Sequence, residues 1–299
     1  MTPDRPSSSP GTSDPHAPGA SDRLSEISEQ DRQRLRVAVT AAKRGGDVLT
    51  RYFRDGVAIR DKSDNGGKTY DLVTDADLES ESVIAASLRE AFPHDELLGE
   101  EALAGGRVDA EDLWVIDPLD GTNNFAHDIP HFAVSIAYYR RGVPAVAVVW
   151  NPARDDCFTA IRGGGAFHNG KPARVSDAET LRQALIGCGF YYDRGEMMRC
   201  TLAAIENFFT LEVHGIRRFG TAALDLCFVG CGQFGGFFEY QLSPWDFAAG
   251  RLFVEEAGGR VTTASGGDLP LEKTGIVASN GRLHDAILAV TSRHLPAQR

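Results

Sequence analysis

Asp117 and Asp120 stand three residues apart at the end of the apolar run 113–116, directly before Gly121 and Thr122. A proline and a glycine within this stretch are expected to end a buried strand, so that both carboxylates sit where the chain leaves a sheet. Backbone N–H groups at the start of a following helix would attract an anion. Paired carboxylates bind hard divalent cations. The stretch therefore predicts metal ions held beside a phosphate group.

Other acidic residues could complete such a site, although each also has a simpler structural explanation. Glu100 and Glu101 follow an apolar pair at another expected strand end, a pattern that is most often a solvated turn. Asp246 lies in the first turn of an expected Ala-rich helix, where a carboxylate also stabilises the helix dipole. Thr74 and Asp77 have the spacing of a capping box, and Asp77 could also accept a hydrogen bond from a threonine beside the metal ions.

Composition excludes several classes of partner. The chain of 299 residues is 42% hydrophobic and carries a formal net charge of -11. Nucleic acids and anionic membranes are bound by clustered Lys and Arg, so neither is expected as a partner. The five cysteines are widely spaced and form no C-x-x-C pair, which indicates free thiols rather than disulfides or a zinc site. His127 and His131 lack a third soft ligand and are interpreted as turn residues.

The apolar pattern predicts an α+β or α/β chain in two halves. Residues 1–25, rich in Ser, Pro and Gly, are expected to be a disordered tail. An N-terminal α+β half that binds metal is expected over 26–175. It should contain amphipathic helices at 28–53 and 77–92, followed by antiparallel strands. Two adjacent glycines are expected to weaken the first helix. A C-terminal α/β half is expected over 176–299. No apolar run approaches the roughly 20 residues of a membrane span, so the protein is placed in the cytoplasm.

In their order along the chain, the segments 99–101, 117–125 and 245–250 resemble the inositol monophosphatase family of metal-dependent sugar-phosphate phosphatases. The resemblance covers about 30–290. It implies a layered αβαβα sandwich of the inositol monophosphatase and fructose-1,6-bisphosphatase type, a homodimer, a Mg²⁺ cofactor and inhibition by Li⁺.

Carried over position by position, the resemblance implies three groups of site residues. The Mg²⁺ ligands would be Glu100, Asp117, the Leu119 carbonyl, Asp120 and Asp246. The residues that handle the attacking water would be Thr122, Asp77 and Glu100. The groups that bind the substrate would be the amides of Gly121 and Thr122, the backbone at Ala222 and the side chain of Glu239. Glu101 matches a second motif glutamate and is the less certain ligand.

The function favoured by this resemblance is Mg²⁺-dependent hydrolysis of a phosphomonoester, first of all inositol 1-phosphate. Asn124 and Phe125 resemble the inositol monophosphatase pattern, and Glu239 suits a small phosphorylated polyol. Histidinol phosphate, fructose 1,6-bisphosphate, 3′-phosphoadenosine 5′-phosphate and the phosphate of NADP stay open as substrates, and the loop 189–195 is expected to decide among them. A regulatory binding protein on the same fold is an alternative from another class, and a passive divalent-ion buffer is a third.

Overall fold

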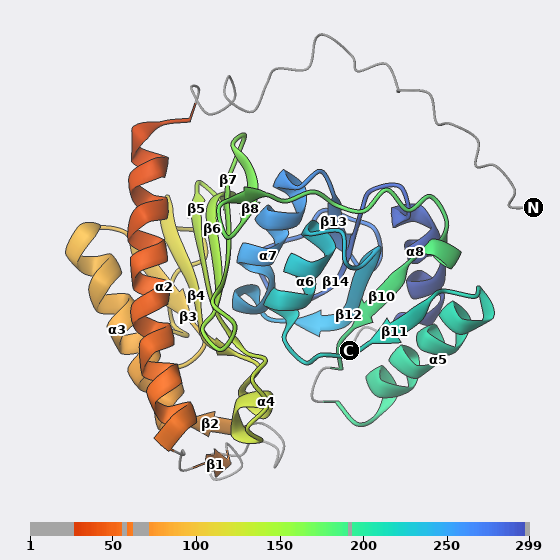
Figure 1. Cartoon of the computed structure of the whole chain (residues 1–299), viewed down its shortest axis with the longest axis horizontal. Helices are drawn as coiled ribbons and strands as arrows, with labels where there is room; N and C mark the ends of the chain where they lie inside the picture. Colours follow the sequence, from red (N-terminus) through yellow and green to blue (C-terminus); the bar gives the residue numbers. More distant parts are fainter. Residues whose placement is uncertain (1–26, 56–58, 62–71, 191–192, 297–299) are drawn as a thin grey trace, which may run out of the picture.

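Layers of helices and sheets alternate through the molecule. The computed structural model describes residues 27–55, 59–61, 72–190 and 193–296. Within them, two helices cover a seven-stranded sheet, two further helices separate it from a five-stranded sheet, and a last pair covers the far side (Figure 1). The expected αβαβα arrangement is therefore confirmed, whereas the expected tail at 1–25 lies outside the described residues.

The first helical layer consists of α2 (Glu29–Asp55) and α3 (Asp75–Ala91), close to their expected bounds. The two glycines of α2 were expected to weaken the helix, but α2 is continuous through them. A Cβ at Gly45 would lie 2.8 Å from Ile84 Cδ1 of α3, and one at Gly46 would lie 2.5 Å from Trp150 Nε1 of the sheet. The missing side chains let the helix approach both neighbours closely.

The larger sheet has the order β3-β4-β5-β6-β7-β8-β9. Its strands are β3 (Glu96–Gly99), β4 (Asp112–Asp120), β5 (Ala133–Arg140), β6 (Val143–Asn151), β7 (Asp156–Ile161), β8 (Gly165–His168) and β9 (Lys171–Pro172). Antiparallel pairing was expected throughout, but β3 and β4 pair in parallel, since the connection 100–111 is long enough to return the chain. Gly99 pairs with Ile116, which sets Glu100 beside Asp117 at the same sheet edge.

The smaller sheet has the order β11-β10-β12-β14-β13. Its strands are β10 (Leu185–Cys188), β11 (Gly215–Arg217), β12 (Gly236–Leu242), β13 (Arg260–Thr263) and β14 (Thr274–Ser279). Helices α6 (Ala222–Gly230) and α7 (Pro244–Glu256) pack between the sheets, while α5 (Glu196–Thr210) and α8 (His284–Thr291) cover the outer face. Residues 173–184 connect the two sheets. The division into two domains near 175 falls in this connection and stays a prediction.

Short elements complete the described chain: β1 (Ile59–Asp61), β2 (Leu72–Thr74), α4 (Thr122–Ala126) and the 3₁₀ helices η2 (Leu181–Gln183) and η3 (Ser292–His294). The sequence did not predict β11 or α8, because three and eight residues are too few to show a period. Among the described helices, none combines the length and the apolar character that crossing a membrane would require.

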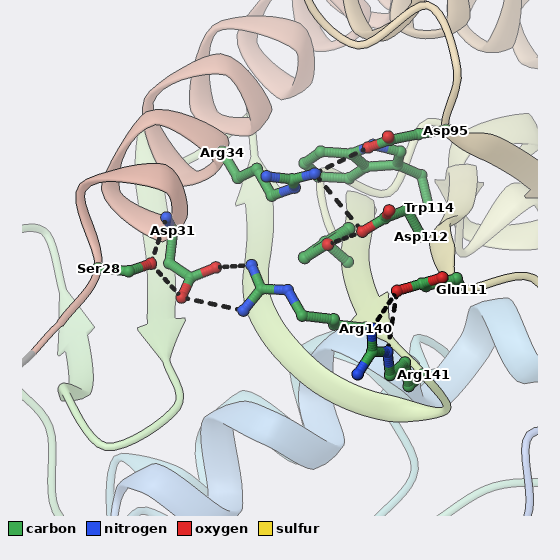
Figure 2. A network of polar contacts seen from close by, with 10 residues as sticks. Ser28, Asp31, Arg34, Asp95, Glu111, Asp112, Trp114, Arg140 and Arg141 are labelled. Atoms are coloured by element: carbon green, nitrogen blue, oxygen red, sulfur yellow. Dashed lines mark hydrogen bonds and ion pairs between the residues drawn. The ribbon is translucent and has the colours of Figure 1, made fainter.

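A polar network fixes the start of α2 to the sheet (Figure 2). Arg34 Nη2 lies 3.4 Å from Asp95 Oδ2 and 3.6 Å from Asp112 Oδ1. Asp31 in the first turn of α2 forms an ion pair of 2.5 Å with Arg140 at the end of β5. The side chains of Arg34 and Asp95 are 12% and 9% exposed, so their interaction is poorly screened by water.

Candidate active site

A pocket of about 280 Å³ lies where the two sheets and the middle helices meet. Its walls come from chain segments far apart in the sequence, at the ends of β3, β4 and β12 and at the starts of α4, α6 and α7. Except for Asp77 and the less certain Glu101, every residue predicted for the site lines it: Glu100, Asp117, Leu119, Asp120, Gly121, Thr122, Ala222, Glu239 and Asp246. Glu101 does not line this pocket.

A bulge in β4 explains how Asp117 and Asp120 share one pocket. Side chains alternate across a strand, so a separation of three residues would put the two carboxylates on opposite faces. Asp117 pairs with Ser135 and Asp120 with Ala133, so β4 uses one residue more than β5 over this interval. The extra residue turns both carboxylates to the same side. The strand was expected to end at Pro118 but continues through it, since a bulge tolerates proline.

A backbone amide donates a hydrogen bond to one oxygen of each of three aspartates in the pocket. The Leu119 amide donates to Asp117 Oδ1 at 3.0 Å. Asp120 Oδ2 accepts from the Ala223 amide at the start of α6 at 2.8 Å. Asp246 Oδ2 accepts from the Ser243 amide at 2.6 Å in a capping box. Asp246 lies in the first turn of α7, as the helix-dipole explanation requires, and the same side chain also lines the pocket.

The electrostatics of this cluster favour a bound cation. Burial raises the pKa of Asp117 well above its usual range, and the negative charges of Glu100, Asp120 and Asp246 raise it further. Burial, followed by repulsion from Asp246, raises the pKa of Asp120 to about 8. Within the described residues, no Lys or Arg forms an ion pair with Asp117 or Asp120. Oxygen donors with excess negative charge suit a hard divalent cation such as Mg²⁺.

The described residues alone do not form a complete metal cage. In the part of the chain that the structure describes, no three acidic, His or Cys side chains are grouped closely enough to hold an ion by themselves. Because amides already hold one oxygen of each aspartate, the remaining coordination positions would fall to the Leu119 carbonyl, phosphate and water, which Mg²⁺ commonly retains. The assignment of individual ligands therefore stays a prediction.

Two residues of α3 support the site and were missed from the sequence. The carboxylate of Glu81 accepts hydrogen bonds from the amides of Glu101 at 3.1 Å and Ala102 at 2.7 Å, which fixes the loop after Glu100. Ser80 Oγ donates to the Pro118 carbonyl at 3.0 Å. A usable signal did exist, because positions 77, 80 and 81 fall on one helical face and all three are polar.

Thr122 and Asp77 lie together at the edge of the pocket. Thr122 Oγ1 donates toward Asp77 Oδ1 at 3.3 Å and lies 3.1 Å from the Leu119 carbonyl oxygen. Asp77 is 1% exposed. The preceding Gly121 has φ 96°, and a Cβ there would lie 2.6 Å from Thr221 Cγ2. Glycine is therefore required for the chain to turn from β4 into α4 beside the carboxylates.

Two further buried carboxylates lie on the wall formed by β12 and α6. Glu239 is 7% exposed, and its burial raises its pKa well above the usual range. Asp225 in α6 also lines the pocket at 1% exposure, and within the described structure its Oδ1 has no hydrogen-bond partner. The sequence alone assigned no role to Asp225.

The cysteines and His131 can be placed in the described structure. All five cysteines are free thiols. His131 packs its ring against Phe219 at 5.3 Å and Phe228 at 6.0 Å, and its burial lowers its pKa to about 4. Its aromatic neighbours suit a neutral packing residue rather than a metal ligand.

Comparisons with known proteins decide the family. The model of the inositol monophosphatase family matches residues 30–295. The chain belongs to this family. It is 43% identical over 262 residues to "Putative Nus factor SuhB" of Neisseria meningitidis serogroup B, covering 87% of this chain and 98% of the relative. It is 41% identical over 265 residues to "Inositol-1-monophosphatase" of Rhizobium meliloti, covering 88% and 98%.

Solved structures of the family agree with the fold. The crystal structure of extragenic suppressor protein suhB from Bartonella henselae has a TM-score of 0.80 and 38% identity, over 87% of this chain and 99% of that one. An IMPase/NADP phosphatase complexed with Mg²⁺ and phosphate has a TM-score of 0.78 and 26% identity, over 88% and 96%. Divalent metal dependence is therefore a property found among structures of this family.

Proposed function

We propose that this chain is a Mg²⁺-dependent phosphomonoester hydrolase whose substrate is inositol 1-phosphate or a closely similar polyol phosphate. The observation that carries the proposal is the bulge of β4, which directs Asp117 and Asp120 into one pocket. Within the described residues neither carboxylate forms an ion pair with a Lys or Arg. The relative named inositol-1-monophosphatase supports the choice of substrate, as does an acidic wall at Glu239, which suits hydroxyl groups.

The residues of the chain would divide the reaction among them. Glu100, Asp117, the Leu119 carbonyl, Asp120 and Asp246 would hold Mg²⁺, which when bound stabilises negative charge and acidifies water. Thr122, fixed by its hydrogen bond to Asp77, would accept a hydrogen bond from the attacking water and aim its oxygen at phosphorus. The amides of Gly121 and Thr122 would bind the phosphate oxygens. Attack by the water oxygen forms a new bond to phosphorus and breaks the bond between phosphorus and the alcohol oxygen. The attacking water loses one proton to solvent, and a second water gives one proton to the leaving alcohol oxygen.

The test is the hydrolysis of inositol 1-phosphate by Asp120→Asn. The substitution keeps the size of the side chain and its ability to accept from the Ala223 amide, but removes the negative charge. We expect kcat/KM to fall by about 100-fold or more, comparable to the loss of one group that stabilises the transition state. Asp109→Asn, at an exposed position away from the pocket, is the control. Undiminished turnover by Asp120→Asn would overturn the proposal.

The finer parts of the proposal need their own measurements. A panel of inositol 1-phosphate, histidinol phosphate, fructose 1,6-bisphosphate, 3′-phosphoadenosine 5′-phosphate and NADP at fixed Mg²⁺ would rank the substrates. Inhibition by Li⁺ and assembly as a homodimer are proposed from family membership. Sedimentation velocity tests the dimer, and a single species at the 32.3 kDa of one chain would refute it.

A regulatory role is the second candidate, favoured by the Nus factor names among the relatives. The net charge of -11 argues against direct contact with RNA, so a protein partner in the transcription machinery is the form to test. Recovery of RNA polymerase on the tagged chain, with Asp120→Asn retaining the cellular phenotype, would favour this role over catalysis. Loss of the phenotype in Asp120→Asn would favour the enzyme.

A further inference from the structure

Gly189, directly after β10, lies in unusually close contact with the pocket residue Glu239 of β12. A Cβ added at Gly189 would lie 1.7 Å from Glu239 Oε2 and 2.3 Å from Glu239 Cδ. Real Cβ atoms do not approach other atoms this closely, so a side chain at 189 and the present position of the Glu239 carboxylate exclude each other.

Strand pairing holds the backbone at Gly189 in place. Strands β10 and β12 pair in parallel, with Cys188 opposite Phe238. The pairing continues past the strand end, because the Gly189 amide donates to the Phe238 carbonyl at 3.2 Å. Position 189 is therefore held beside Glu239, and a new side chain would have to displace the carboxylate.

Backbone conformation does not explain the glycine. Gly189 is absent from the residues with positive φ, so an L-residue could adopt its φ. This distinguishes it from Gly121, whose φ of 96° itself favours glycine. Space for the Glu239 carboxylate is the remaining requirement at Gly189.

We propose that Gly189 is a specificity-determining residue, which positions the Glu239 carboxylate to accept a hydrogen bond from a hydroxyl group of a polyol phosphate. The proposal rests on the proposed phosphatase function and concerns the alcohol side of the substrate. Both residues line the pocket. A displaced carboxylate would weaken recognition of the hydroxyl groups more than it weakens binding of the phosphate, which the opposite wall would hold.

The experiment compares kcat/KM for inositol 1-phosphate with that for phenyl phosphate, which offers no hydroxyl group. In Gly189→Ala we expect kcat/KM for inositol 1-phosphate, divided by kcat/KM for phenyl phosphate, to fall about tenfold. The fall should come chiefly from a higher KM for inositol 1-phosphate, as for the loss of one hydrogen bond to a charged group. Gly105→Ala is the control, because Gly105 lies outside this pocket and a Cβ there would have no atom within 4 Å. It should leave both values unchanged.

A double variant tests whether the effect passes through Glu239. Glu239→Asp shortens the side chain by one methylene and withdraws the carboxylate from the added methyl group. We therefore expect Gly189→Ala to lower the ratio less than about threefold in the Glu239→Asp background. If Gly189→Ala fails to fold, a folded double variant would also support the proposal, because only relief of the contact with Glu239 connects the two changes.

The contrary outcomes are distinct. An equal fall for both substrates, an equal effect of Gly189→Ala in both backgrounds, or failure of both variants to fold would give Gly189 a purely structural role and overturn the proposal. If the unmodified protein hydrolyses neither substrate, the proposed function fails and this inference fails with it.

Discussion

The carboxylate of Glu81 does not line the pocket but supports the loop that follows Glu100. It is 1% exposed and accepts two amides of the loop that follows Glu100. Gly99 is fitted to it, since a Cβ there would lie 2.2 Å from Glu81 Oε1. The position of Glu100 in the pocket therefore depends on a residue that contacts neither metal nor substrate.

Glu81→Gln is expected to raise the Mg²⁺ concentration for half-maximal activity about tenfold, in the range found for residues that orient metal ligands. The amide nitrogen of glutamine cannot accept a hydrogen bond, so either the Glu101 or the Ala102 amide loses its partner and the loop shifts. The measurement is a Mg²⁺ titration of activity. Glu79→Gln, on the same helix as Glu81, is the control, because Glu79 forms an exposed ion pair with Arg51 of α2 and a hydrogen bond with Tyr52. An unchanged titration midpoint in Glu81→Gln would contradict this prediction.

For individual residues, the sequence predicted those whose side chains could bind a metal ion. Asp117, Asp120 and Asp246 could be predicted to lie in one pocket because they stand in segments that resemble the motifs of a known family. The polar face of α3 marked Glu81 without giving its role, since an acid on an amphipathic helix also resembles a solvated face. The role of Gly189 could not be predicted, since a glycine after a strand resembles a turn. Their roles depend on which atoms of distant segments approach them, and that information exists only in the folded chain.

Among the elements, α2 depends on Arg34 for its attachment to the sheet (Figure 2). The guanidinium carbon lies 4.8 Å from the ring centroid of Phe92 and 4.3 Å from that of Tyr138, while its nitrogen approaches Asp95 and Asp112. Burial raises the pKa of Asp95, which shows that its carboxylate depends on nearby partners. Arg34 thus joins α2 to both the sheet and the end of α3.

Arg34→Ala is expected to lower the free energy of unfolding by about 3 kcal/mol, because it leaves the Asp95 carboxylate, whose side chain is 9% exposed, without its cation. Arg36→Ala on the same helix is the matched control. Its pair with Glu29 has side chains 63% and 74% exposed, and such pairs contribute about 1 kcal/mol or less. Denaturant unfolding of both variants tests the difference. Equal losses would show that the buried network adds nothing beyond an exposed pair.

Element positions could be predicted better than element partners. The two long helices and most strands follow from apolar periodicity, which is a local property. The parallel pairing of β3 with β4 and the close approach of α2 at Gly45 and Gly46 could not be predicted, because they depend on how distant segments pack. The same holds for the bulge of β4, since its extra residue shows only against the register of β5.

For the molecule as a whole, the pocket joins the layers. The helix α6 starts at the amide that holds Asp120, and α7 starts with the turn that contains Asp246. The larger sheet contributes Asp117 and Asp120 to the same place. Without a cation, their mutual repulsion and burial oppose the packing of the sheet against the middle helices, as the raised pKa values of Asp117 and Asp120 indicate.

Binding of Mg²⁺ should therefore stabilise the whole fold. At a concentration about 100 times the Kd, a ligand that binds only the folded state adds about 2.7 kcal/mol, which corresponds to a rise in Tm of about 5 °C for a chain of this size. At pH 8, Asp120→Asn should have a higher Tm than the unmodified protein without Mg²⁺, because it removes a charge that burial opposes. It should also gain less from Mg²⁺. Thermal unfolding at matched ionic strength, with and without Mg²⁺, tests both expectations. An equal rise in Tm with Mg²⁺ in the two proteins would show that Asp120 is not a metal ligand.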